Sequence, residues 1–204
     1  MLSLGGWEYA ILPPQVDETP LPGEGGVDYV QRLARTKVEA AASQAGADGV
    51  IIAADTTVII QPAGGREQIL AKPCDRADAG LMLRLLRGRT HQVHTALSIL
   101  SIRDGTLVAD LCTTDVPMRN YTEDEIAAYV ASGDPLDKAG AYAIQHAGFH
   151  PVERMDGCYA NVMGLPLCHL TRGLRKFGIT PMTDLPQACQ AALGYNCPVY
   201  SRII

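Results

Sequence analysis

Apolar positions along the first third of the chain follow first the spacing of a helix and then that of a buried strand. Between Val27 and about Gln44 they recur every three or four residues, which predicts a helix that ends before Gly46. Residues 50–60 are apolar and rich in β-branched side chains on both faces. Such a run is typical of a strand covered on both sides, so we expect residues 50–60 at the centre of the fold.

The middle of the chain alternates between strand and helix patterns. Ile69–Pro73 is expected to return along the first strand, after a turn at Gly64 and Gly65. A helix is predicted from about Ala77 to Arg87, capped by Asp75 or Asp78 and ended by Gly88. Residues 91–102 and 106–119 have strand character, and Asp104-Gly105 between them is typical of a tight turn. These two segments therefore predict a long antiparallel pair.

Two further helices are expected toward the end of the chain. Thr122–Glu125 has the sequence of a capping box, and Gly133 and Pro135 close the helix that it starts. Pro166 is predicted at the first position of a last helix, which Gly178 ends. Residues 12–26 are rich in proline and glycine and predict an irregular segment. We expect one domain over residues 1–178 and a C-terminal tail over residues 179–204.

Composition narrows the class of protein. The 204 residues are 47% hydrophobic and 19% charged, and no apolar run is long enough for a membrane span, so an ordinary α/β globule is expected. A net charge of -5 argues against binding a nucleic-acid polymer. The six cysteines include no CxxC pair, and the N-terminus lacks the pattern of a secretory signal. We therefore expect a cytoplasmic protein with reduced thiols and no membrane contact.

Asp55 is the most informative single residue, because it interrupts the apolar run of residues 50–60. Burying an unpaired carboxylate there would cost several kcal/mol, so a hydrogen bond, a cation or a metal must compensate it. The alternative is a strand end at which Asp55 meets solvent or a backbone amide. The residue pattern alone leaves both interpretations open.

Other candidate residues follow in two short segments. Lys72, in Ala-Lys-Pro, ends the returning strand, where it is either a ligand-binding cation or an exposed lysine. Lys138 stands among small residues in the segment 137–145, which also contains Gln145. Small residues allow a ligand to approach the backbone closely, although a tight turn would explain them as well. No nucleotide-binding glycine loop, HExxH or GxSxG motif is present, and the histidines and cysteines lack the spacing of a zinc site.

Taken in order, several segments resemble the Maf family of nucleotide pyrophosphatases. They are distributed over about residues 16 to 175, and their order and spacing are more specific than any one of them. The matching segments are Val16–Glu18, Leu33–Lys37, Ala53–Thr56, Leu70–Pro73, Met82–Gly88, His91–Thr95, Asp137–Tyr142, Ile144-Gln145 and Gly164–Leu167.

The resemblance implies a fold, a reaction and a set of site residues. The fold is an elongated α/β structure like that of inosine-triphosphate pyrophosphatases, with a mixed sheet, flanking helices and a central cleft. The reaction is hydrolysis of a nucleoside triphosphate, dTTP or UTP, to the monophosphate and pyrophosphate with Mg²⁺ or Mn²⁺. The implied roles are water activation and metal binding for Asp55, metal binding for Glu18, triphosphate binding for Lys37, Lys72 and Lys138, and base selection for Thr56 and Gln145.

The sequence also departs from the family pattern at its start, and rival functions stay open. The family begins with a strand and a Ser-x-x-Arg-Arg turn that grips phosphate, whereas Met1–Trp7 resembles the segment after it, so we expect the true start to lie upstream. One rival is a pyrophosphatase for a modified base or inosine triphosphate. Another is a nucleotide-binding regulator of septation without turnover. The expected partners are a nucleoside triphosphate and a second copy of the chain in a homodimer.

Overall fold

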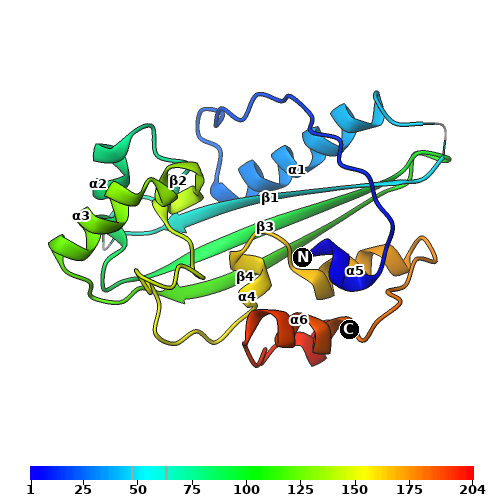
Figure 1. Cartoon of the computed structure of the whole chain (residues 1–204). Coiled ribbons are helices and arrows are strands. Elements are labelled where there is room, and N and C mark those ends of the chain that lie inside the picture. The colour runs from blue at the N-terminus through cyan, green and yellow to red at the C-terminus, as the bar shows by residue number, and fades with distance from the viewer. Residues whose placement is uncertain (47, 63) are drawn as a thin grey trace.

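Four strands form an open sheet in the order β2-β1-β3-β4 in the computed structural model, which describes residues 1–46, 48–62 and 64–204 (Figure 1). The strands are β1 (Val50–Ile60), β2 (Gln68–Leu70), β3 (Thr90–Ser101) and β4 (Leu107–Pro117). Every pairing between them is antiparallel, so the described sheet is antiparallel throughout, whereas the resemblance implied a mixed sheet. Strand β2 pairs only with residues 58–60, so β1 continues beyond β2 along β3 alone.

Helix α1 (Gly26–Ala42) covers one face of the sheet with its apolar side (Figure 1). Its Val30 packs on Ala96 of β3, and Val38 packs on Ile51 of β1. At the start of the helix, the backbone N–H of Gly26 donates to the Glu67 carboxylate at 2.7 Å. That hydrogen bond satisfies a helix-terminal amide and, with the packing, places α1 along β1.

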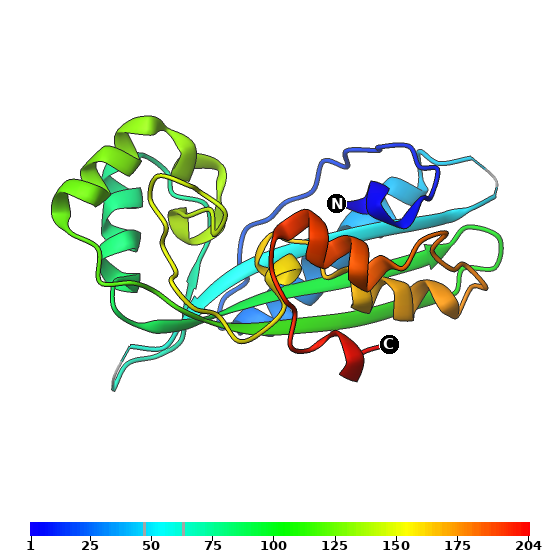
Figure 2. The same ribbon diagram turned by 60° about the horizontal axis from the view of Figure 1, so that its bottom comes forward.

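Helices α4 (Tyr159–Val162), α5 (Leu167–Arg175) and α6 (Leu185–Leu193) lie on the other face, as the turned view shows (Figure 2). Leu97 and Ile99 of β3 share a core with the buried leucines of α5 and with Leu185. Asp184 caps α6 by accepting a hydrogen bond from the Gln187 amide at 3.1 Å. The sequence analysis did not predict α6, because only Leu185 of this helix is fully buried and its apolar pattern is correspondingly weak.

The N-terminal residues contact the segment before α6. The short 3-10 helix η1 (Leu2–Gly5) is followed by Trp7, whose indole N–H donates to the Thr180 carbonyl at 3.0 Å. The Met182 amide donates to the Gly5 carbonyl at 2.9 Å. A last 3-10 helix, η4 (Tyr200–Arg202), lies near the C-terminus. The two ends of the chain therefore pack on the same side of the sheet (Figure 2).

A separate hydrophobic core fills the end of the molecule formed by α2 (Arg76–Leu86) and α3 (Glu123–Ser132) (Figure 1). Tyr121 is buried there and donates to the Leu83 carbonyl at 2.6 Å. The 3-10 helices η2 (Asp134–Asp137) and η3 (Ala139–Ala141) follow α3 and return toward β1. The fold thus has two parts, with β1 passing from one to the other.

The structure confirms the α/β class with its flanking helices and corrects details at the element ends. Asp75, rather than Asp78, caps α2 by accepting from the Asp78 amide at 2.8 Å. The predicted capping box of α3 is present, with Thr122 and Glu125 bonded reciprocally. Pro166 is the N-cap of α5 rather than its first helical residue, because its ψ of 91° is extended. Where the sequence has a strong local signal, the predicted ends of helices and strands therefore agree with the structure to within a few residues.

Candidate active site

A cavity of about 320 Å³ opens where β1 passes from one part of the fold to the other. Its walls come from the segment before α1, from α1 and β1, from the loop after β2, from η2 and η3, and from the residues after α4. Residues far apart in the sequence are therefore brought to one place. All seven residues to which the resemblance assigns a role line this cavity, namely Glu18, Lys37, Asp55, Thr56, Lys72, Lys138 and Gln145.

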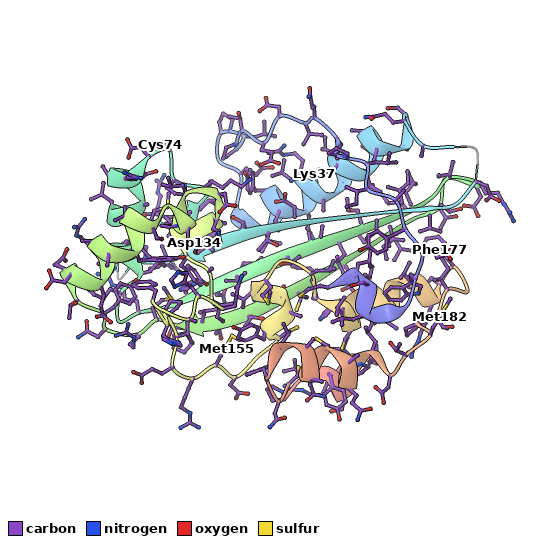
Figure 3. The ribbon with its side chains drawn as sticks, viewed as in Figure 1. Lys37, Cys74, Asp134, Met155, Phe177 and Met182 are labelled. Carbon is purple, nitrogen blue, oxygen red and sulfur yellow. The ribbon has the colours of Figure 1, made fainter. Side chains whose placement is uncertain are left out.

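Asp55 lies at the middle of β1 and is only 8% exposed. Its carboxylate accepts a hydrogen bond from the ammonium group of Lys37, which projects from α1 (Figure 3). Burial raises the pKa of Asp55 above its usual value, although the hydrogen bond from Lys37 opposes the shift. The buried carboxylate is thus compensated by a cation. Of the two interpretations left open for Asp55, the structure supports the compensated carboxylate.

Lys37 binds a second carboxylate, that of Glu18, at 2.7 Å. Burial alone would lower the pKa of Lys37, but its hydrogen bonds to Asp55 and Glu18 outweigh burial and raise it. The ammonium group therefore stays charged at neutral pH. One Glu18 oxygen and one Asp55 oxygen consequently converge on a single positive charge.

The irregular segment that carries Glu18 is held in place by α1. The hydroxyl of Tyr29 donates to the Glu18 carbonyl at 2.9 Å. Arg32 binds Glu24 at 2.6 Å and also donates to the Thr19 carbonyl at 3.2 Å. The guanidinium group of Arg32 lowers the pKa of Glu24 to about 2. Side chains of α1 thus position a segment that has no helix or strand of its own.

Two further lysines face the cavity from the loop after β2 and from the residues after η2. Lys72 is exposed, whereas Lys138 binds Asp137 at 2.6 Å and Asp134, labelled in Figure 3, at 3.2 Å. The Gly140 amide donates to the Ala71 carbonyl at 3.2 Å and so links the two segments. Lys138 is therefore already paired, and a ligand phosphate has to compete with two carboxylates for it.

Uncharged residues complete the lining of the cavity. Its lining includes Thr56, Val93, Val162, Met163 and Gly164. The hydroxyl of Thr56 lies 2.8 Å from that of Thr95 on β3. Gln145 is exposed and lines the same cavity. The cavity thus combines charged side chains with hydroxyl, amide and apolar groups.

The carboxylates of Glu18 and Asp55 are also ligands of the kind that a divalent cation prefers. Both offer hard oxygen ligands and both already bind one cationic group, the Lys37 ammonium. Within the described parts of the chain, no group of three or more histidine, cysteine, aspartate or glutamate side chains has the arrangement of a metal site. A divalent cation held by these two carboxylates would take its remaining oxygen ligands from a bound ligand or from water.

Sequence reasoning missed residues that act at the site through others. Tyr29 lies on the apolar side of α1 and was indistinguishable from a core residue until its hydroxyl was seen on the Glu18 carbonyl. Thr95 belongs to one of the segments that resemble Maf, but nothing in the sequence indicated its contact with Thr56.

Comparison with known proteins gives the family. The family model described as "Maf-like protein" matches residues 1–177. The chain belongs to the Maf family. Among its relatives is a protein of Geobacter sulfurreducens named "dTTP/UTP pyrophosphatase", 41% identical over 178 residues that cover 87% of this chain and 90% of the relative. The resemblance deduced from the ordered segments is thereby confirmed.

Two other relatives carry the same name. The protein from Methylobacillus flagellatus is 45% identical over 175 residues, which are 85% of this Maf chain and 84% of the relative. The protein from Pasteurella multocida is 41% identical over 182 residues, covering 85% and 88%. No helix of the described residues has the length and apolar character needed to cross a membrane.

Proposed function

We propose that this Maf protein hydrolyses nucleoside triphosphates, with dTTP and UTP as its substrates, to the monophosphate and pyrophosphate. The observation that carries the proposal is a buried carboxylate, Asp55, sharing the Lys37 cation with Glu18 in a cavity that also holds Lys72 and Lys138. Relatives named dTTP/UTP pyrophosphatase support the substrate class.

The charges of the cavity suit a polyphosphate. A triphosphate brings about four negative charges, and the three lysines of the lining are balanced by the carboxylates of Glu18, Asp55 and Asp137, so the lysines need a divalent cation beside them to offset that charge. Glu18 and Asp55 would hold Mg²⁺ or Mn²⁺, which neutralises phosphate oxygens and polarises the phosphorus. Lys37 then moves its positive charge from the two carboxylates toward the phosphates.

Asp55 is suited to act as the general base. Burial raises the pKa of this carboxylate, which makes it a better proton acceptor than an exposed aspartate, and the Lys37 ammonium bound to it favours the ionised form. Asp55 accepts a proton from water, the water oxygen attacks the phosphorus nearest the nucleoside, and the bond to the second phosphate breaks. Pyrophosphate leaves and the nucleoside monophosphate remains.

The proposal extends to the setting of the reaction. The cytoplasmic location stays a prediction from the sequence, which has six cysteines and no CxxC pair. The homodimer and the absence of binding to nucleic-acid polymers stay predictions from the sequence.

The test is pyrophosphate release from dTTP, UTP, CTP and inosine triphosphate with Mg²⁺ or Mn²⁺. We expect release from dTTP and UTP, and a loss of at least about 100-fold in Asp55→Asn because a general base contributes that much. Asp156→Asn, which changes an exposed aspartate away from the cavity, is the matched control and should keep full activity.

Other outcomes would contradict the proposal. If pyrophosphate were released only from inosine triphosphate or from a nucleotide with a modified base, dTTP and UTP would not be the substrates. Nucleotide binding without pyrophosphate release, unchanged by Asp55→Asn, would indicate a nucleotide-binding regulator instead of an enzyme.

A further inference from the structure

Five of the six cysteines gather where the C-terminal tail packs on the sheet and on α5. They come from β4, from the residue before α4, from α5, from α6 and from the segment after α6, and are Cys112, Cys158, Cys168, Cys189 and Cys197. All of them except Cys112 line one cavity of about 20 Å³, and Cys112 packs on Cys158 beside it. These segments are remote in the sequence, so only the fold brings the thiols together.

Tyr195 anchors the tail beside Cys158. The Tyr195 hydroxyl accepts from the Gly157 amide at 3.3 Å and lies 3.0 Å from the Gly157 carbonyl oxygen. Cys197 follows Tyr195 by two residues, and its amide donates to the side chain of Gln190 on α6 at 2.9 Å. The backbone on either side of the two thiols is therefore held by hydrogen bonds, and Cys197 is kept next to Cys158.

The thiols of Cys158 and Cys197 are in hydrogen-bonding contact. That contact, together with burial, raises the pKa of the Cys197 thiol. Cys158 also contacts the thiol of Cys112, and this second hydrogen bond, together with burial, raises the pKa of Cys158 to about 12. Three sulfur atoms thus follow one another from β4 to the tail, with that of Cys158 in the middle.

Access from solvent differs among these three thiols. Cys112 is 4% exposed and Cys158 is 6% exposed, whereas Cys197 is half-buried. A reagent in solution therefore reaches Cys197 first. A sulfur atom that is reachable from solvent and touches a second, buried thiol has the arrangement that disulfide exchange requires.

We propose that Cys158 and Cys197 form a modification site, a thiol pair that closes to a disulfide in the presence of a small-molecule disulfide such as oxidised glutathione. Cys197 attacks the reagent, forms a mixed disulfide with it and releases the first reagent thiol. Cys158 then attacks the Cys197 sulfur, so the protein disulfide forms and the second reagent thiol leaves. The two protein thiols are oxidised, the reagent is reduced, and the two protons pass to the leaving thiolates.

The disulfide fastens the C-terminal tail to α4. Cys158 is the N-cap of α4, and Val162, the last residue of this helix, lines the candidate active site. The family model matches residues 1–177, so the tail lies beyond the match. The thiol pair therefore ties a segment outside the family match to a helix that forms part of the site.

The test is peptide mapping by mass spectrometry without reductant, after the folded chain has been incubated with oxidised glutathione. Cys74 is exposed and would react by itself, so Cys74→Ser is the background for every variant. We expect one disulfide within the chain, between Cys158 and Cys197. It should form over hours, because the raised pKa of Cys197 leaves little thiolate. It should raise the unfolding temperature by about 5 °C or more, because it closes a long loop.

Three further serine variants separate the roles of the thiols. In Cys197→Ser both the disulfide and the rise in unfolding temperature should be absent. In Cys158→Ser no thiol displaces glutathione from Cys197, so a mixed disulfide at Cys197 should accumulate. Cys112→Ser is the matched control and should keep the disulfide, because Cys112 contacts Cys158 without belonging to the pair. If Cys158→Ser does not fold, Cys197→Ser still tests the pair at a half-buried position.

Several results would overturn the inference. They are a disulfide between Cys112 and Cys158, disulfides between chains only, or no disulfide after prolonged incubation. A disulfide between Cys158 and Cys197 that leaves the unfolding temperature unchanged would show that it does not fasten the tail. Mass and unfolding temperature are measured without any nucleotide, so the outcome is independent of the proposed function.

Discussion

The ammonium group of Lys37 on α1 binds the buried carboxylate of Asp55 on β1, and the same group binds Glu18 at 2.7 Å. One side chain therefore joins a helix, a strand and an irregular segment at the candidate active site. Because Lys37 neutralises two carboxylates in the cavity that we propose to bind a triphosphate, its removal should affect both stability and activity.

Lys37→Met should lower kcat/KM for UTP by about 10- to 100-fold, the worth of one or two hydrogen bonds to a charged group. It should also reduce the free energy of unfolding, because Asp55 is left buried without its cation. The loss should be below the ~3–5 kcal/mol of a fully buried pair, since the Lys37 side chain is 20% exposed.

Steady-state kinetics and denaturant unfolding measure the two effects of Lys37→Met. Lys176→Met, at an exposed position on the C-terminal end of α5, is the matched control and should change neither. Full activity in Lys37→Met would show that Lys37 is a structural residue only.

Tyr29→Phe should weaken catalysis through the position of Glu18, without removing a charge from the cavity. The phenolic hydroxyl donates to the Glu18 carbonyl at 2.9 Å, so its loss releases the segment that carries Glu18. We expect kcat/KM to fall by about fivefold and the Mg²⁺ concentration for half-maximal activity to rise, as loss of one hydrogen bond allows.

Tyr9→Phe provides the comparison for Tyr29→Phe, because Tyr9 is 52% exposed and lies outside the cavity. Both variants are assayed over a Mg²⁺ titration. An identical Mg²⁺ dependence in Tyr29→Phe and the unaltered chain would contradict a positioning role for Tyr29.

Gly140→Ala should destabilise the fold through a steric contact with β1. Gly140 has φ +70°, and a Cβ atom there would lie 3.0 Å from both methyl groups of Val58. Gly105 also has φ +70°, but its added Cβ would meet nothing within 4 Å. The difference between Gly140→Ala and Gly105→Ala isolates overpacking from backbone strain, and we expect about 1–3 kcal/mol.

The measurement for this glycine pair is urea unfolding of both variants. Because the Gly140 amide also links to the Ala71 carbonyl next to Lys72, Gly140→Ala should lower activity as well. Equal unfolding free energies for the two variants would mean that the Val58 side chain moves aside without a loss of stability.

Glu125 should make stability depend on pH in the acidic range. Its hydrogen bond from Arg119, and then that from the Thr122 amide, lower the pKa of Glu125 from 4.5 to about 2. A lowered pKa stabilises the folded state above pH 4.5, and this contribution is lost as the pH falls from about 4.5 to about 2.

Glu125→Gln should therefore unfold at a lower temperature than the unaltered chain at pH 7, and the difference should shrink as the pH falls toward 2. Thermal unfolding at a series of pH values measures it. Glu153→Gln, at an exposed position, should show no such trend. A difference between Glu125→Gln and the unaltered chain that grows on acidification would reverse the assigned sign.

The sequence by itself determined the elements whose signals are local. Residues 50–60 were predicted as a buried strand and form β1, and the capping box at Thr122 starts α3 as expected. Periodicity and caps act between residues a few positions apart, so they can be deduced without the fold. The carboxylate of Asp55 in an apolar strand also required a compensating partner on energetic grounds alone.

Only the tertiary structure shows that the partner of Asp55 is Lys37 and which groups the other residues of the site contact. Lys37 lies 18 positions from Asp55, and Thr95 lies 39 positions from Thr56. Helix α6 likewise depends on the face of α5 that it covers. Such contacts depend on how the strands pair and how the helices pack, because no local pattern encodes the distance between segments remote in the chain.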